Sequence, residues 1–101
     1  MRVIRAGAGT RWSVDPGRVA VAGFSAGGHV AGRLATRAAS AVYDPIDAVD
    51  RLSARPDVAG LFFPVVTMLD DGVHAQSRRE LLGTHAADPD WQRRYSTQIG
   101  L

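Results

Sequence analysis

The sequence predicts an α/β fold built around one β-α-β unit. Two apolar runs, residues 18–24 and 58–66, carry apolar side chains on both faces, a pattern typical of buried parallel strands. Between them, residues 26–38 are rich in alanine and place Val30 and Leu34 at helical spacing. Parallel strands need a crossover connection, which is usually a right-handed helix, so the three segments are expected to form one unit.

Shorter elements are predicted on either side of this unit. They are a helix end at 2–12, a turn at 13–17, a loop with a helical turn (46–51) at 40–57, and short helices at 75–82 and 88–95. Asp88 and Pro89 are typical of a helix start, Gly83 is typical of a helix end, and Pro64 marks where the second strand's ladder ends. Two strands cannot cover both faces and both edges of a sheet, so we expect a larger domain.

The sequence Gly23-Phe24-Ser25-Ala26-Gly27 lies where the first strand meets the helix. A strand, a tight turn with a central serine and a helix form the G-x-S-x-G nucleophile elbow of serine hydrolases. Glycines are expected at 23 and 27 because side chains there would collide with the neighbouring strand and helix. We predict Ser25 as the nucleophile and the backbone N–H of Ala26 as an oxyanion donor. A plain glycine-rich turn is the alternative.

A serine nucleophile needs a base within hydrogen-bond reach and a carboxylate that orients this base. His29 follows Ser25 by four residues, and its position favours packing or a hydrogen bond behind the nucleophile over a role as base. His74 follows the carboxyl end of the second strand, where α/β sites lie, so it either lines a pocket or lies in a surface loop. His85 is expected to be exposed. The histidines have no metal-ligand spacing.

Four residues are candidates for lining a pocket near the nucleophile: Phe24, His29, Pro64 and His74. Phe24 is expected mainly in the core, although its place next to Ser25 also suits a pocket wall. Asp70 and Asp71 precede a glycine and predict a solvated turn rather than a triad acid.

Composition narrows the function further. The 101 residues are 46% hydrophobic and 22% charged, which suits one small globular domain. All twelve basic residues are scattered arginines and the net charge is +2, which argues against nucleic-acid binding. No apolar run approaches the roughly 18 residues of a membrane span, and no signal-peptide core follows Met1, so cytoplasm is the default localisation. Without cysteine there is neither a disulfide nor a thiolate metal site.

Residues 12–31 resemble α/β-hydrolase esterases, and most closely the bacterial acetylxylan-esterase-like lipases and esterases. Further similar stretches are Tyr43–Asp47, Ser53–Asp57, Phe63–Val65 and His74–Gly83. The resemblance implies that residues 1–101 are the nucleophile-elbow portion of an incomplete α/β-hydrolase fold, a third to a half of a domain of about 200–250 residues. The family's His-Gly-Gly-Gly-type oxyanion loop, triad acid and Gly-His-Gly-Phe-type histidine segment do not occur in these residues.

The resemblance implies a carboxylic ester hydrolase that cleaves small acetyl-type esters through an acyl-serine at Ser25. It implies no cofactor and no metal, and its expected partner is a small-molecule ester, for which an acetylated sugar is a candidate. Nucleic acid and membrane partners are not expected. Two alternatives stay open: a non-catalytic remnant or degenerate relative of the fold, and a serine peptidase on the same fold. We expect the 101-residue chain alone to be inactive because its triad is incomplete.

Overall fold

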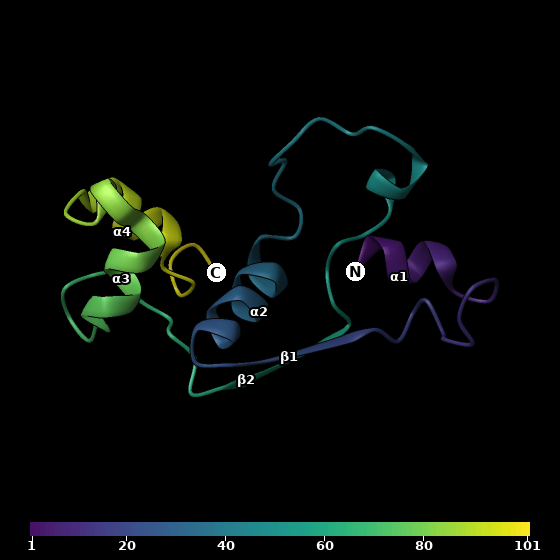
Figure 1. The fold of residues 1–101 in the computed structure, drawn as a ribbon, viewed down its shortest axis with the longest axis horizontal. Helices are drawn as coiled ribbons and strands as arrows, with labels where there is room; N and C mark the ends of the chain where they lie inside the picture. Colours follow the sequence, from purple (N-terminus) through teal and green to yellow (C-terminus); the bar gives the residue numbers. More distant parts are fainter.

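A computed structural model describes residues 1–101 and shows a two-stranded parallel sheet with helices beside it (Figure 1). Strand β1 is Ala20–Phe24, strand β2 is Val58–Phe62, and helix α2, Ala26–Arg37, connects them. The strands pair in register from Ala20 opposite Val58 to Phe24 opposite Phe62. The predicted α/β class and its β-α-β unit are therefore confirmed.

Five short helical segments complete the chain. They are α1 (Arg2–Gly7), the 3-10 helix η1 (Ala48–Arg51), α3 (Ala75–Leu82), the 3-10 helix η2 (Gly83–His85) and α4 (Pro89–Tyr95). Helix α1 ends earlier than the predicted residue 12 because the chain turns back at Gly7, whose carbonyl accepts hydrogen bonds from the N–H groups of Arg11 and Trp12. None of the helices combines the length and the apolar composition that crossing a membrane requires.

Strand β2 is shorter than the predicted 58–66, and the prediction is wrong for its last four residues. Phe63 adopts a positive φ of 47°, which turns the chain out of the ladder directly after Phe62. Pro64 has no N–H to donate, so the ladder cannot resume there. Strand β1 likewise begins at Ala20 and not at residue 18. These short strands leave the segment after β2 free to curve toward the start of α2.

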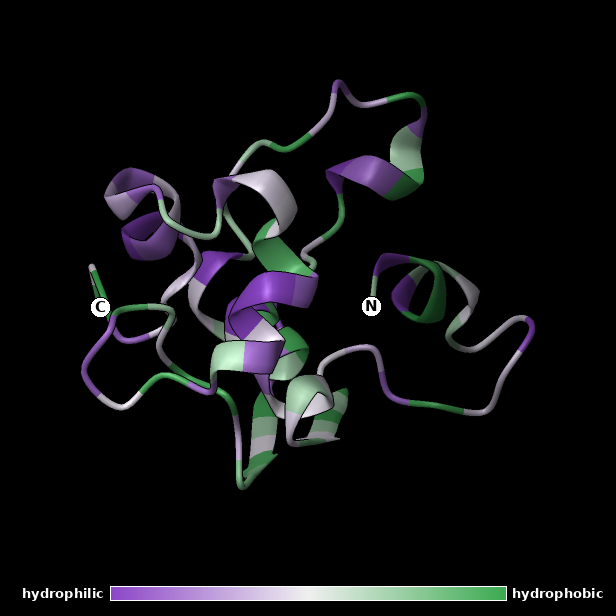
Figure 2. Cartoon of the chain, turned by 60° about the vertical axis from the view of Figure 1, so that its left-hand side comes forward, coloured by the Kyte–Doolittle hydropathy of each residue, from purple (hydrophilic) through white to green (hydrophobic).

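The expectation that both strands are fully buried is wrong for this chain. Helix α2 packs on one face of the sheet, and no helix lies on the other face (Figures 1 and 2). Phe24 and Phe62 stack on each other with ring centroids 4.6 Å apart, yet Phe24 is 66% exposed. The apolar residues of β1 and β2 form the green strands of Figure 2, and in β1 only Gly23 is buried. The sheet therefore has an apolar face that this chain does not cover.

Helix α4 supports the segment that follows β2. The Ser96 hydroxyl, just after α4, accepts a hydrogen bond from the Met68 N–H at 2.8 Å, and the Thr97 N–H donates to the Val66 carbonyl at 2.8 Å. Asp88 caps this helix by accepting from the N–H of Asp90 at 2.9 Å, with Pro89 at the first helical position, as predicted. The helix that Asp88 caps is therefore followed directly by the residues that hydrogen-bond to the segment after β2.

Replacing Asp88 by alanine should destabilise the chain by about 1 kcal/mol, because the first-turn N–H groups of α4 lose their acceptor. The free energy of unfolding from urea titration measures this loss. The Asp88→Asn variant keeps an acceptor oxygen and should stay within a few tenths of a kcal/mol of the wild type. An equal loss in both variants would contradict the capping role.

Candidate active site

Ser25 forms the turn between β1 and α2. Its backbone has φ 52° and ψ −116°, a conformation that costs a residue with a side chain about 1–3 kcal/mol. Three backbone hydrogen bonds hold it: the Ser25 N–H donates to the Phe62 carbonyl at 3.0 Å, and its carbonyl accepts from the N–H groups of His29 at 3.1 Å and Val65 at 3.2 Å. The turn is therefore fixed both by its own helix and by the end of β2.

The Ser25 hydroxyl is not used to cap α2. A serine at this position ordinarily accepts a hydrogen bond from an N–H of the first turn, but Ser25 makes no such bond. The residue is exposed, and so is Ala26, the first residue of α2. An N–H at this position has no partner within the helix and lies at its positive end. The turn thus presents a hydroxyl beside a donor that suits a developing oxyanion.

Two glycines let the strand and the helix approach each other at this turn. A Cβ on Gly23 would lie 2.1 Å from the Gly27 carbonyl oxygen, and a Cβ on Gly28 would lie 2.8 Å from the Cβ of Pro64. A Cβ on Gly27 would meet nothing within 4 Å. The steric expectation is confirmed for Gly23 and is wrong for Gly27. Gly28, which sequence reasoning did not single out for packing, is the second glycine that the close approach requires.

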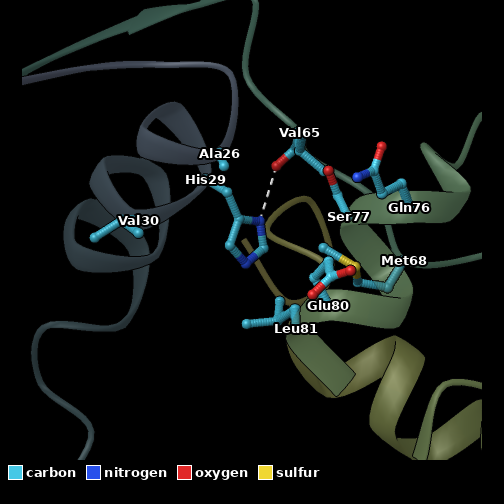
Figure 3. Close-up of a pocket in the computed structure, with 9 residues that line it drawn as sticks. All are labelled: Ala26, His29, Val30, Val65, Met68, Gln76, Ser77, Glu80 and Leu81. Carbon is cyan, nitrogen blue, oxygen red and sulfur yellow. Dashed lines mark hydrogen bonds between the residues drawn. The ribbon is translucent and has the colours of Figure 1, made fainter. Parts of the chain in front are cut away.

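His29 lies one turn along α2 and lines a pocket of about 370 Å³ between α2 and α3 (Figure 3). This α2–α3 pocket is also lined by Ala26, Val30, Val65, Met68, Gln76, Ser77, Glu80 and Leu81. The imidazole is buried, with 6% of the residue exposed, and its Nδ1 lies 2.8 Å from the Val65 carbonyl oxygen. Because a carbonyl only accepts, Nδ1 carries the proton. Nε2 is therefore the lone-pair nitrogen, and it is buried without a partner.

This geometry does not make His29 a base for Ser25. Its protonated nitrogen is engaged by Val65, and no hydrogen bond joins its ring to the Ser25 hydroxyl. The ring instead connects α2 to Val65, and the N–H of Val65 donates a hydrogen bond to the Ser25 carbonyl. That arrangement is the one that the packing alternative predicts.

Acid should destabilise the chain through His29. Burial lowers the pKa of His29 from its ordinary value, the hydrogen bond to Val65 opposes this shift, and the charge of Arg33 adds to it. The folded state then binds fewer protons than the unfolded chain, so stability falls as the pH drops below about 6.5 toward the lowered pKa. We expect the midpoint of thermal unfolding to fall between pH 7.5 and 5.5, and to fall less in His29→Gln, which does not titrate. In His85→Gln, which changes an exposed histidine, the wild-type pH dependence should persist. An unchanged slope in His29→Gln would refute this role.

Ser25 itself lines a second pocket of about 250 Å³, here named the Ser25 pocket. Its other lining residues are Phe63, Pro64, Val65, Val66, Thr67, Gly72 and His74. The predicted pocket residues therefore divide between the two cavities: Pro64 and His74 lie with Ser25, and His29 lies in the α2–α3 pocket. Phe24 lines neither of these two pockets, because its ring stacks on Phe62 at the sheet surface.

The remaining candidate side chains lie apart from the serine. Asp70 forms a surface ion pair with Arg78, with Oδ1 and Nη1 2.5 Å apart, and His85 stacks on Trp91 with ring centroids 4.1 Å apart. No three histidine, aspartate or glutamate side chains gather closely enough to hold a metal ion. The structure thus brings together a hydroxyl, a backbone donor and two flanking pockets, without a histidine–carboxylate pair at Ser25.

Sequence comparison relates the chain to two curated proteins. It is 33% identical over 88 residues to an acetylxylan esterase of Xylanibacter ruminicola, and 36% identical over 90 residues to endo-1,4-beta-xylanase B of Butyrivibrio fibrisolvens. The matches cover 86% and 89% of this chain but 16% and 14% of those proteins. The chain is thus similar to a small segment of carbohydrate-active enzymes. No family model matches it, and no solved structure matches it.

Proposed function

We propose that this chain is the nucleophile-elbow segment of an α/β-hydrolase that cleaves small acyl esters, with Ser25 as the nucleophile. The observation that carries the proposal is the conformation of Ser25, which is strained, exposed and not used as a helix cap. A serine that served only the helix would accept a first-turn hydrogen bond and would need no positive φ. The similarity to an acetylxylan esterase supports acetyl esters of carbohydrates as the substrate class.

In the proposed reaction the Ser25 oxygen attacks the ester carbonyl carbon while a base removes its proton. The carbonyl oxygen becomes an oxyanion that the Ala26 N–H stabilises, and the alcohol then leaves with the proton from the base. Water attacks the acyl-serine, releases the carboxylic acid and restores the Ser25 hydroxyl. Neither His29 nor His74 hydrogen-bonds to Ser25, so we propose that the base, its acid and a second oxyanion donor come from other segments of the full-length protein.

A glycosidase role, suggested by the similarity to a xylanase, fits the site less well. Glycoside hydrolysis ordinarily requires two carboxyl groups on opposite sides of the scissile bond. The Ser25 pocket has no carboxylate in its lining, and Asp70 is paired with Arg78 at the surface. A serine next to a backbone donor instead suits acyl transfer.

Acetylated xylo-oligosaccharides test the proposal on the full-length gene product. Release of acetate without new reducing ends supports an esterase, whereas new reducing ends without acetate would overturn it. A fluorophosphonate probe should label the protein on Ser25, as located by peptide mass spectrometry. Comparing an acetate ester with the matching anilide then separates an esterase from a peptidase.

A further inference from the structure

His74 has one ring nitrogen fixed by the start of α3. It is the N-cap of this helix, and its Nδ1 accepts a hydrogen bond from the Ser77 N–H at 3.3 Å and lies 2.8 Å from the Ser77 Oγ. A backbone N–H can only donate, so Nδ1 must present a lone pair. A neutral imidazole has a single N–H, which therefore lies on Nε2.

This tautomer decides what His74 can do in the Ser25 pocket. A protonated Nε2 cannot accept the proton of Ser25, so the neutral ring is a hydrogen-bond donor and not a base. Besides Ser25 and His74, the polar side chain in the lining is Thr67, whose hydroxyl oxygen accepts a hydrogen bond from the Leu69 N–H at 3.1 Å. His74 lines this pocket, and its hydrogen bonds use only Nδ1, so its Nε2–H is left free to donate.

The two donors near Ser25 come from different elements: Ala26 begins α2, and His74 is the N-cap of α3. Ala26, the proposed oxyanion donor, lines the α2–α3 pocket, whereas His74 lines the Ser25 pocket. In the proposed reaction the carbonyl oxygen of the ester lies at the Ala26 N–H, and the rest of an acetyl group is a methyl, which accepts no hydrogen bond. The alcohol portion is therefore the part that a second donor can bind, and a hydrogen-bond donor there discriminates alcohols with additional oxygen atoms from those without them.

We propose that His74 is a specificity-determining residue that donates its Nε2–H to a hydroxyl or ring oxygen of the ester's alcohol portion. The inference rests on the proposed function and adds to it the residue that selects the alcohol: through His74, an ester of a polyhydroxylated alcohol, such as a sugar, is preferred over an ester of a plain aryl alcohol.

The His74→Asn variant tests this assignment on the full-length gene product. Asparagine is a strong N-cap and keeps α3 capped, but its shorter side chain has no donor at the place of Nε2. We expect kcat/KM for acetylated xylobiose to fall about tenfold, mainly through KM, because one hydrogen bond to bound substrate is lost. For phenyl acetate, whose alcohol has no free oxygen substituent, kcat/KM should change less than about twofold, since it lacks that bond. His85→Asn, which changes a histidine outside the pocket, should leave kcat/KM for both esters unchanged.

The outcomes separate this inference from the proposed function. An equal loss on both esters would mean a structural role for His74, and no loss on either would mean no contact; both overturn the inference. Turnover of phenyl acetate without turnover of acetylated xylobiose by the wild type would overturn it as well, while leaving Ser25 as a nucleophile. Wild-type protein that hydrolyses neither ester would overturn both proposals. Nitrogen NMR provides a reading independent of activity: a proton on Nδ1 of neutral His74 would contradict the donor assignment.

Discussion

Ser25→Ala should lower the rate of ester hydrolysis by the full-length gene product by at least about 10⁴-fold, because no acyl-enzyme can form without the hydroxyl. Initial rates on phenyl acetate measure the loss, and the fluorophosphonate label should disappear in parallel. Ser13→Ala, which changes an exposed serine that makes no side-chain hydrogen bond, should keep both the rate of hydrolysis and the label. Undiminished turnover in Ser25→Ala would exclude Ser25 as the nucleophile.

Ser25→Gly separates the chemical role of this residue from its structural cost. Glycine adopts a positive φ without the steric penalty that a side chain imposes, so this variant should be as inactive as Ser25→Ala but more stable than the wild type by about 1 kcal/mol. Urea unfolding of both variants provides the comparison. A Ser25→Gly variant no more stable than wild type would show that the turn is not strained.

Gly23→Ala should be the most destabilising single-methyl change at the elbow, by about 3 kcal/mol or more. The new Cβ would lie 2.1 Å from the Gly27 carbonyl oxygen, a backbone atom, so the start of α2 would have to move away from β1. The hydroxyl of Ser25 and the N–H of Ala26 would move with it, and activity should fall together with stability.

Gly27→Ala is the matched control, since it adds the same methyl group four residues away. Its Cβ meets nothing within 4 Å, and alanine is a better helix former than glycine, so the chain should gain up to about 1 kcal/mol. Urea titration of both variants gives the two free energies of unfolding to be compared. Equal losses at the two positions would contradict the packing described for the elbow.

Local sequence signals predicted the elements that depend on neighbours in the chain. Helix α3 has the predicted bounds, 75–82, and α4 has its predicted cap because Asp88 and Pro89 act within one helical turn. The tight turn at Ser25 was equally readable, because a strand, a small-residue turn and a helix are adjacent. The end of β2 was predicted only in part: Pro64 indicated that the ladder ends near it, but nothing local requires the positive φ of Phe63, which ends the strand at Phe62.

Contacts between distant segments could not be read from the sequence in the same way. Gly28, and not the adjacent Gly27, must lack a side chain because of its contact with Pro64, which comes much later in the chain. The role of His29 depends on the Val65 carbonyl, 36 residues away. The tautomer of His74 follows from its role as the N-cap of α3. That role could not be predicted from the sequence, because histidine is not among the common N-cap residues.

The backbone bonds of Ser25 to Phe62 and Val65 also have a consequence for the order of folding. Helix α2 can form from local interactions, but two of the three backbone hydrogen bonds that hold Ser25 come from residues about 40 positions further along the chain. Synthesis of about 40 residues takes seconds at roughly 5–20 residues per second, whereas a helix forms within about a microsecond. During synthesis, the G-F-S-A-G sequence is therefore made well before all three hydrogen bonds of Ser25 can form. The elbow is assembled only once β2 and the segment beyond it have docked.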